Sequence, residues 1–301
     1  QDALRRDFTI NALSCNRDGH IFDYADGLAD IEARRVRFIG DAQQRVREDY
    51  LRILRFFRFH AAYGEGALDA QAFHACVIER EGMHNLSRER IRAELMKLLG
   101  ARNCAPTIAT MCGAGLLLPV LAGVAMPARL ARVIEIEHAR GTKADPMLRL
   151  IALCVLVRED AERLREELRL SNAQAQRAQA AAQALETLHG CMAPPQAQDL
   201  RALLYQHGAQ SIRDALTLAQ AEAGVPAHEA DWAKADALLA TTPKPQLPFS
   251  GADLLARGVT PGRGMGATLK AVERLWIAAD FPSDAATLAH LLDKALSQQD
   301  S

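Results

Sequence analysis

The chain has 301 residues, 49% of them hydrophobic and 24% charged, with a formal net charge of −1 at pH 7. This length and composition are typical of a globular protein of two or three modules with a sizeable core. A net charge so close to zero excludes attraction of nucleic acid over the whole surface, so any RNA contact must come from local patches. The aromatic content of 5%, beside abundant Ala and Leu, favours helices over sheets.

Strand character is confined to the first 40 residues. Residues 8–15 and 20–24 predict a hairpin across the turn at 16–19, and residues 36–39 predict a third short strand. We expect these to be the trailing strands of a mixed sheet whose first strands are not in the chain. Such a remnant exposes an unpaired edge, so we expect it to be poorly stable alone.

From residue 41 onward the sequence predicts helices almost without interruption. Ser87, Ser171 and the pair Asp145-Pro146 are typical of helix starts, because a side-chain oxygen there accepts a free backbone N–H. The proline-rich run 241–248 is the segment most typical of a stiff linker. The predicted helices cover residues 44–63, 69–81, 87–100, 104–113, 127–140, 146–157, 159–168, 172–188, 196–207, 210–223, 228–240, 250–256, 264–279 and 284–298.

Six cysteines form no C-x-x-C pair and do not combine with the nine histidines at zinc-ligand spacing. They are typical of reduced residues in a cytosolic protein, which predicts a cytoplasmic location. No apolar run approaches the roughly 18 residues of a membrane span, so we expect no membrane partner.

Residues 48–59 (EDYLRILRFFRF) are the most informative helical segment. At 100° per residue the apolar side chains form one arc, and charged side chains gather on the other side. Asp49 and Arg52 are three residues apart, so they stand next to each other on this polar side. The residues alone also fit a solvated face stitched by ion pairs, each worth about 0.3–0.5 kcal/mol. The polar side comprises Arg45, Glu48, Asp49, Arg52 and Arg55.

Five further segments precede or follow this helix along the chain. They are residues 5–13 (RRDFTINAL), 23–31 (DYADGLADI), 86–94 (LSRERIRAE), 168–172 (LRLSN) and 258–262 (GVTPG) running on to Gly266. Together with residues 48–59, they resemble the bacterial tRNA nucleotidyltransferases that add CCA, and their sister poly(A) polymerases. The resemblance covers nearly the whole chain.

The resemblance implies a mainly α fold, in which an elongated multi-helix neck, body and tail follow a small β remnant of a nucleotidyltransferase head. The implied modules are residues 1–40 (head remnant), 41–115 (neck), 116–192 (body) and 193–301 (tail). The implied activity adds C and A from CTP and ATP to the acceptor end of tRNA, with Mg²⁺ assisting the departure of pyrophosphate. A poly(A) polymerase and a non-catalytic helical RNA-binding module are the alternatives.

The family carries a metal-binding Asp-x-Asp pair and a Gly-Gly-x-x-Arg-Asp nucleotide loop before the segment that resembles residues 5–13. The chain begins beside that segment, and no Asp-x-Asp occurs in its 301 residues. Phosphoryl transfer of this kind needs carboxylates that hold the metal against the phosphates. We therefore expect the chain to be inactive by itself and assign it no catalytic or metal-binding residue.

In the family, the motif at Asp49 and Arg52 is the protein template for the incoming base. An arginine has only donors and an ionised aspartate only acceptors. Cytosine and adenine each offer an amino donor beside an acceptor ring nitrogen, whereas uracil and guanine present the reverse. Buried polar groups left unpaired cost about 1–3 kcal/mol each, so such a pair can favour C and A. The resemblance assigns base recognition to Asp49 and Arg52, with Arg55 and Glu48 assisting.

The other implied site residues lie in three of the matching segments. Arg5 and Arg6 match the family segment that meets the triphosphate, where guanidinium contacts are charge-assisted. Asp7 or Asn11 is then placed to take the ribose hydroxyl, although Asp7 also fits a simple ion pair with an arginine. The segment holding Arg90 and Glu94 braces the template helix in the family; a surface pair between these two is the alternative.

Two glycine-containing segments complete the prediction. Asp23, Asp26 and Asp30 surround Gly27, and the family has a flexible link between head and neck here, so we predict a hinge or turn and not a metal site. Backbone amides at the start of a helix bind anions, which predicts an RNA-phosphate contact at the second segment, with a tight turn as the alternative. Its residues are Gly262, Arg263, Gly264 and Gly266.

Overall fold

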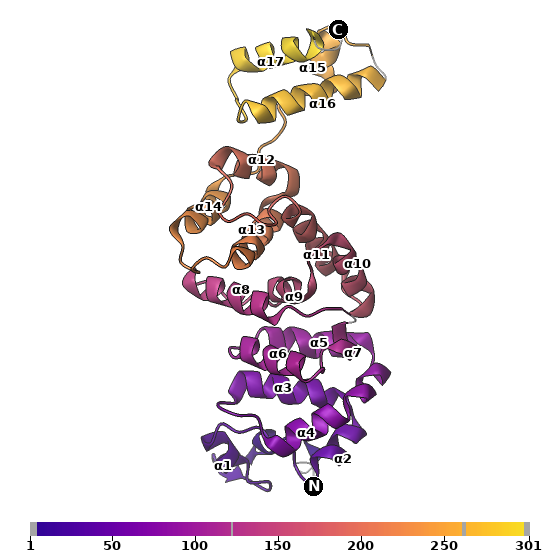
Figure 1. The fold of residues 1–301 in the computed structure, drawn as a ribbon, viewed down its shortest axis with the longest axis vertical. Coiled ribbons are helices and arrows are strands. Elements are labelled where there is room, and N and C mark those ends of the chain that lie inside the picture. Colours follow the sequence, from indigo (N-terminus) through magenta and orange to yellow (C-terminus); the bar gives the residue numbers. More distant parts are fainter. Residues whose placement is uncertain (1–4, 122, 261–262, 298–301) are drawn as a thin grey trace. The chain divides into compact units, whose positions relative to one another are not determined.

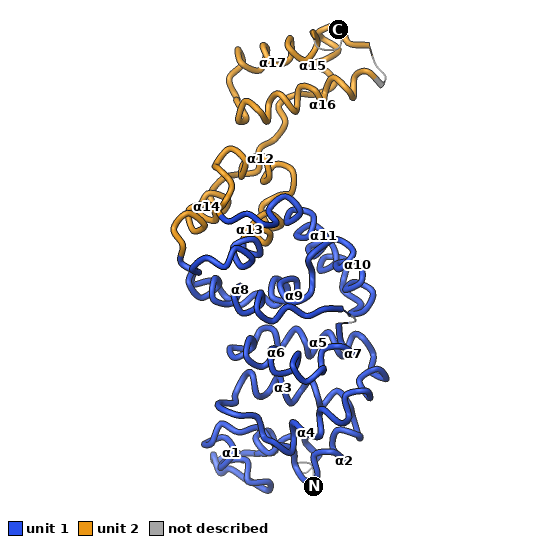
Figure 2. The backbone as a smooth tube through the Cα atoms, viewed as in Figure 1, with its two compact units in different colours: residues 1–192, 217–228 blue, residues 193–216, 229–301 orange. Residues whose placement is uncertain are grey.

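The computed structural model describes residues 5–121, 123–260 and 263–297. It is mainly α, with seventeen α-helices and one two-stranded sheet among these residues (Figure 1). This confirms the predicted fold class. The chain divides into two compact units, one of residues 1–192 with 217–228 and one of residues 193–216 with 229–301 (Figure 2). The four modules 1–40, 41–115, 116–192 and 193–301 stay a prediction.

The sheet is smaller than the sequence predicts. β1 (Ser14–Cys15) and β2 (Ile21–Phe22) pair antiparallel, with Ser14 opposite Phe22, so the predicted hairpin is present but short. The prediction of a strand from residue 8 is wrong, because Thr9–Asn11 is a 3-10 turn (η2) in which the Asn11 side chain accepts the Phe8 N–H at 3.2 Å. The predicted strand 36–39 contributes only a single bridge, between Phe8 and Phe38.

The acidic segment that follows the hairpin forms a turn and the start of α1 (Gly27–Glu32). Asp23 accepts the backbone N–H of Gly27 at 3.0 Å and that of Leu28 at 2.9 Å, which builds the turn. These hydrogen bonds lower the pKa of the Asp23 carboxyl. A Cβ at Gly27 would lie 2.3 Å from the Thr9 carbonyl oxygen, so only glycine lets α1 approach η2 this closely.

Asp30 on α1 has a role that the sequence did not reveal. Its side chain is fully buried, accepts the Thr9 hydroxyl at 2.6 Å, and forms ion pairs with Arg35 at 2.7 Å and Arg37 at 2.5 Å. Burial alone would raise the pKa of Asp30, but these three donors outweigh it and lower the pKa. Asp30 therefore anchors the segment after α1 as a carboxylate.

The predicted helix 44–63 is wrong in one respect that affects the site. The structure has two helices, α2 (Ala42–Glu48) and α3 (Leu51–Tyr63), with Asp49 between them in an extended conformation at φ −158°. The Asp49 carboxylate accepts the Leu51 N–H at 3.1 Å and so helps to start α3. Tyr50 lies against Gly82, where a Cβ would come within 2.1 Å of the Tyr50 ring.

α3 packs most extensively against α5 (Arg88–Leu99). The buried face of α3 carries Phe56 and Phe57, and that of α5 carries Ile91 and Leu95, all fully buried. Two arginines of α3, Arg52 and Arg55, bond Asp7 in the segment before η2. The remaining elements of this region are α4 (Ala70–Ile78), the 3-10 helix η3 (Arg80–Asn85), α6 (Cys104–Gly113) and α7 (Leu118–Leu121).

The first unit continues through α8 (Pro127–Ala139), α9 (Pro146–Cys154), α10 (Arg158–Glu167) and α11 (Asn172–Leu185). The predicted caps are confirmed: the side chains of Ser87, Ser171 and Asp145 each accept a backbone N–H from the first turn of their helix. Two arginines that the sequence did not single out, Arg129 and Arg149, are almost fully buried.

Asp145 provides a pH-dependent test of this packing. Burial alone would raise the pKa of Asp145, but Arg177, whose Nη2 lies 2.5 Å from Oδ2, and the Met147 and Leu148 N–H groups lower it. A carboxyl with a lowered pKa stabilises the fold above its ordinary pKa of about 3.9 and loses that effect as the pH falls through its folded pKa. Asp145→Asn should therefore lower the free energy of unfolding at pH 7 by about 0.5–1 kcal/mol, because solvent screens this partly exposed pair.

Urea denaturation of both proteins from pH 7 to pH 2.5 measures this effect. The asparagine still caps α9, so the difference reports the ion pair with Arg177. The difference should shrink toward the acid end, and a difference that does not change with pH would contradict the ion-pair explanation.

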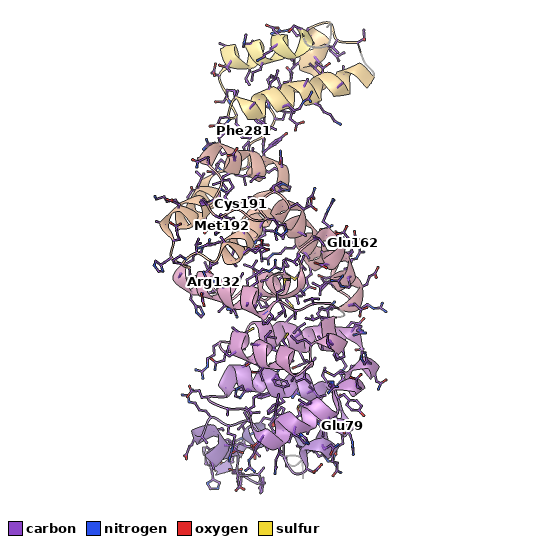
Figure 3. The ribbon with its side chains drawn as sticks, viewed as in Figure 1. Glu79, Arg132, Glu162, Cys191, Met192 and Phe281 are labelled. Carbon is purple, nitrogen blue, oxygen red and sulfur yellow. The ribbon has the colours of Figure 1, made fainter. Side chains whose placement is uncertain are left out.

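The second unit contains α12 (Ala197–His207), α14 (Ala230–Thr241), α15 (Gly251–Ala256), α16 (Arg263–Ala278) and α17 (Ala285–Ser297), while α13 (Ala209–Ala223) contributes residues to both units. Trp276 and Phe281 meet edge to face with ring centroids 4.8 Å apart (Figure 3 labels Phe281). Tyr205 meets Trp276 in the same way and donates its hydroxyl to Glu273. This core also includes Phe249, Leu254, Ala271, Val272, Leu291, Leu292 and Ala295.

A candidate nucleotide-recognition site

A network of arginines and carboxylates joins residues 5–7 to α2 and α3. Asp7 lies at its centre, where its Oδ1 accepts Nε of Arg52 at 2.8 Å and its Oδ2 accepts Nε of Arg55 at 2.5 Å. The side chains of Asp7 and Arg52 are only 14% and 13% exposed. The structure thus shows the ion pair that was the alternative explanation of Asp7. A contact of Asp7 with a ribose hydroxyl stays a prediction.

Arg52 is held from several sides. Its Nη1 donates to Glu48 Oε2 at 2.5 Å and to the Arg45 carbonyl oxygen at 2.6 Å, besides the bond from Nε to Asp7. Burial alone would lower the pKa of Arg52, but hydrogen bonds to Glu48 and Asp7 outweigh it and raise the pKa. The hydrogen bond from Arg52 is also the main cause that lowers the pKa of Glu48. Arg52 is therefore a fixed cation, and Glu48 is ionised beside it.

Arg45 connects α2 to the first described residues. Its Nη1 lies 2.5 Å from Glu48 Oε2, and its Nη2 donates to the carbonyl oxygens of Arg5, at 3.0 Å, and Arg6. The backbone of Arg5 and Arg6 is thereby fixed while both side chains are exposed. The sequence placed Arg45 on the polar face without a role; the structure shows that it orients the segment predicted to meet the triphosphate.

Asp49 is positioned by contacts on both carboxylate oxygens. Oδ1 accepts the Leu51 N–H at 3.1 Å, and Oδ2 lies 2.7 Å from Nη2 of Arg90 on α5. The Arg52 N–H donates to the Asp49 carbonyl oxygen at 3.0 Å, so the two residues span one turn. The prediction that both stand on one continuous helix is wrong, yet a turn brings them to the same end of α3.

α5 braces this region through two residues. Arg90 pairs with Asp49 and not with Glu94, which corrects the alternative of a surface pair between them. Glu94 is 6% exposed and forms ion pairs with Arg58 at 2.7 Å and Lys97 at 3.1 Å, with Arg55 further away at 3.9 Å. A buried glutamate at the α3–α5 contact thus fixes the arginine-bearing face of α3.

The remaining predicted residues lie outside this network. Asn11 caps the Phe8 N–H and lines a separate pocket. Gly262 and the side chain of Arg263 lie outside the described residues. Gly264 and Gly266 lie in the first turns of α16, where a Cβ would meet nothing within 4 Å. The phosphate contact assigned to this segment stays a prediction.

The network leaves hydrogen-bonding capacity for a ligand. Among the contacts between described residues, Nε and Nη1 of Arg52 are engaged and its Nη2 is not. An arginine has five N–H donors, so Nη2 keeps two. Each Asp49 oxygen accepts one hydrogen bond, although a carboxylate has about four acceptor positions. Donors and acceptors are therefore offered one turn apart on a partly exposed surface.

No group of three or more His, Cys, Asp or Glu side chains that could hold a metal ion occurs within the described ranges 5–121, 123–260 and 263–297. Over the same part of the chain, every helix is too short or too polar to cross a bilayer.

Comparison with known proteins identifies the family. Residues 142–292 match the family model described as tRNA nucleotidyltransferase domain 2, residues 1–37 that of the poly(A) polymerase head domain, and residues 67–126 that of the RNA- and SrmB-binding site of polymerase A. The CCA-adding enzyme of Limosilactobacillus fermentum is 30% identical over 295 residues, which are 96% of this chain and 70% of that protein. The chain belongs to the CCA-adding enzyme family.

Other members of the family match in part or in fold. The mitochondrial CCA tRNA nucleotidyltransferase 1 of the mouse is 46% identical over 101 residues, so the match spans 33% of this chain and 23% of that CCA-adding relative. The solved Bacillus stearothermophilus CCA-adding enzyme in complex with CTP superposes with a TM-score of 0.71 at 23% identity, over 99% of this chain and 75% of that one. The Thermotoga maritima CCA-adding enzyme complexed with tRNA has a TM-score of 0.66 at 17% identity, over 99% and 73% of the two chains.

Proposed function

We propose that this chain serves CCA addition to tRNA and contributes the selection of CTP and ATP. Membership of the CCA-adding family supports this function. The observation that carries it is the arrangement around Arg52, which is fixed by Asp7 and Glu48 while its Nη2 has no partner among the described residues, one turn away from the similarly fixed Asp49. A surface salt bridge alone would not need a guanidinium held from three sides.

The chemical basis of selection is complementarity of donors and acceptors. Arg52 donates to the acceptor ring nitrogen of cytosine or adenine, and Asp49 accepts from the neighbouring amino group. Uracil and guanine bring an acceptor where Asp49 needs a donor, which leaves buried polar groups unpaired at a cost of about 1–3 kcal/mol each. Because Arg90 and the Leu51 N–H orient Asp49, this discrimination does not depend on a mobile side chain.

The triphosphate is assigned to Arg5 and Arg6, with Arg55 nearer the base. Arg45 fixes the two carbonyl groups of Arg5 and Arg6, so their exposed side chains start from a defined backbone. In the intact reaction a tRNA 3′ hydroxyl attacks the α-phosphate of CTP or ATP, and pyrophosphate leaves. Enzymes of this family generally use a divalent metal, for which we propose Mg²⁺. The described residues hold no fitting ligand group, so we assign no metal-binding residue to this chain.

Equilibrium binding of the four nucleoside triphosphates tests the proposal. The chain should bind CTP and ATP in preference to UTP and GTP, and Asp49→Ala should reduce the preference for CTP over UTP by about fivefold or more. Asp69→Ala is a matched control, because the Asp69 carboxylate accepts a backbone N–H at the start of α4, as Asp49 does at the start of α3, but Asp69 lies outside the network. An unchanged preference in Asp49→Ala, or an equal loss in Asp69→Ala, would refute the template role.

RNA binding needs a separate measurement. A filter-binding titration of the chain with a tRNA lacking CCA and with an unrelated hairpin should show tighter binding of the tRNA. Equal affinity for both RNAs would favour the alternative, a general RNA-binding module.

A poly(A) polymerase is the second candidate, since two of the matching family models carry that description. It would select ATP alone. Comparable binding of CTP and ATP therefore separates the CCA-adding function from this candidate. We also propose a cytoplasmic location, which the six free cysteines support.

A further inference from the structure

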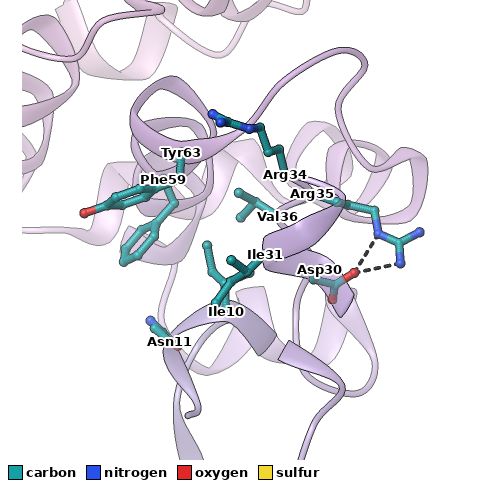
Figure 4. Close-up of a pocket in the computed structure, with 9 residues that line it drawn as sticks. All are labelled: Ile10, Asn11, Asp30, Ile31, Arg34, Arg35, Val36, Phe59 and Tyr63. Atoms are coloured by element: carbon teal, nitrogen blue, oxygen red, sulfur yellow. Dashed lines mark hydrogen bonds and ion pairs between the residues drawn. The ribbon is translucent and has the colours of Figure 1, made fainter. Parts of the chain in front are cut away.

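A pocket of about 480 Å³ lies between α1, the segment after it and the last turns of α3 (Figure 4). Phe59, which lines it, follows Arg52 by seven residues, or roughly 10 Å along the helix. None of the residues that line the pocket belongs to the base-recognition network, although the Arg55 guanidinium lies 5.7 Å from the centroid of the Phe59 ring. Its volume falls in the range of small-molecule sites, about 300–1,000 Å³.

Two walls of this pocket suit a planar ring. Phe59 and Tyr63 are four residues apart on α3, with ring centroids 5.8 Å apart, and Tyr63 is 59% exposed. Phe59 is fixed by Phe8, at 5.0 Å between ring centroids, and by the guanidinium of Arg58 at 4.3 Å. Figure 4 shows Ile31, which is 45% exposed, across the pocket from this aromatic pair.

The charged residues that line the pocket are two arginines, Arg34 and Arg35, and one carboxylate, Asp30. The buried carboxylate of Asp30 is already neutralised by Arg35 and Arg37. Among the described residues, the Arg34 guanidinium pairs with Glu65 alone, at 3.0 Å, and the two side chains are 50% and 57% exposed. Such pairs contribute about 0–1 kcal/mol, so a phosphate can compete for the guanidinium of Arg34.

We propose that this pocket binds a nucleoside monophosphate unit, with its base between Tyr63 and Ile31 and its phosphate against Arg34. Asn11 lines the same pocket and its Oδ1 accepts the Phe8 N–H, so its amide N–H groups are the ones left to donate to a base. The unit comes either from a free nucleotide or from an unpaired residue of an RNA chain. The site goes beyond the proposed function, since it uses neither Asp49 nor Arg52, and it gives Asn11 a role in this pocket in place of the predicted contact with the ribose of the incoming nucleotide.

Calorimetric titration of the 301-residue chain with AMP tests the stacking wall. Base stacking on an aromatic side chain is worth enough that Tyr63→Ala should weaken AMP binding about fivefold or more. Tyr24→Ala is the matched control, because Tyr24 is similarly exposed, at 64%, but does not line the pocket. Equal affinities of the two variants would overturn the proposal.

The phosphate contact has its own matched pair. Arg34→Gln should weaken AMP binding and reduce its dependence on salt. Arg102→Gln removes a guanidinium that pairs with the same Glu65 oxygen, at 3.3 Å, but lies outside the pocket lining. It should leave AMP binding unchanged. An equal effect of both variants would mean that only the Glu65 contacts matter, which would overturn the assignment.

Two further titrations test which site AMP occupies and whether the natural ligand is a free nucleotide or RNA. The Asp49→Ala variant should bind AMP as tightly as the original chain does. Weaker AMP binding by this variant would show that AMP occupies the base-recognition network and not this pocket. A five-residue oligoadenylate that binds more tightly than AMP, with the same response to Tyr63→Ala, identifies RNA as the source. Weaker binding of the oligomer identifies a free nucleotide. Failure of both probes to bind would refute the site.

Discussion

Replacing Glu137 with Ala is expected to lower the free energy of unfolding by about 3–5 kcal/mol. Glu137 on α8 is 4% exposed, and its Oε2 accepts Nε and Nη2 of Arg149, each at 2.7 Å. Its Oε1 accepts the Asp145 N–H at 3.1 Å. Arg149 is itself 2% exposed, so loss of the carboxylate leaves a buried guanidinium whose remaining partners among the described residues are the carbonyl oxygens of Leu99 and Ala101.

Glu135→Ala is the matched control for this substitution. Glu135 lies on the same helix and pairs with Arg132 at 2.5 Å, but it is 53% exposed. Its replacement should change stability by no more than about 0.5 kcal/mol. Urea denaturation followed by far-UV circular dichroism measures both effects. Similar midpoints for the two variants would show that Arg149 finds other partners, and that the buried pair does not stabilise the fold.

The helices could be predicted because their signals are local. A cap is built within one turn, as at Ser171, where the side chain accepts the Gln174 N–H, and a helix that begins there needs no distant partner. The break at Asp49 and Tyr50 could not be predicted in this way. Its causes include the fit of Tyr50 against Gly82, which lies 32 residues away, and the ion pair of Asp49 with Arg90. Helical periodicity continues through residue 49, so only tertiary contacts reveal the break.

The sequence identified residues of the site, but it did not identify which of them pair with one another. The charged side of residues 48–59 was identified, but sequence spacing pairs Asp49 with Arg52, whereas the structure pairs Arg52 with Asp7 and Asp49 with Arg90. Partners that are about 40 residues apart in the chain leave no periodic signal. Arg149, by contrast, could have been recognised from composition. A single arginine in the apolar run MLRLIALC indicates a charge that is buried and paired.

Conservative replacement of Arg52 by Lys is expected to weaken CTP and ATP binding about tenfold or more. A hydrogen bond to a charged group contributes about 1.5–3 kcal/mol, and lysine has no planar fork with which to bond Asp7, Glu48 and the Arg45 carbonyl oxygen together. A lysine that forms ion pairs with both Asp7 and Glu48 has no group equivalent to Arg52 Nη2 left to donate to the base. The positive charge is retained, so we expect the fold to survive.

Arg47→Lys separates this effect from a general one. Arg47 lies on α2 and is 59% exposed, and its Nε donates to Glu79 at 2.8 Å (Figure 3 labels Glu79). Its replacement should leave all four nucleotide affinities unchanged, because a lysine there still reaches a single carboxylate. Equilibrium binding of CTP, ATP and UTP to the two variants shows whether nucleotide binding depends on the geometry of the Arg52 guanidinium or only on a positive charge at this position. If Arg52→Lys binds CTP as the original chain does, a point charge suffices at this position, and the fixed guanidinium is not what selects the base.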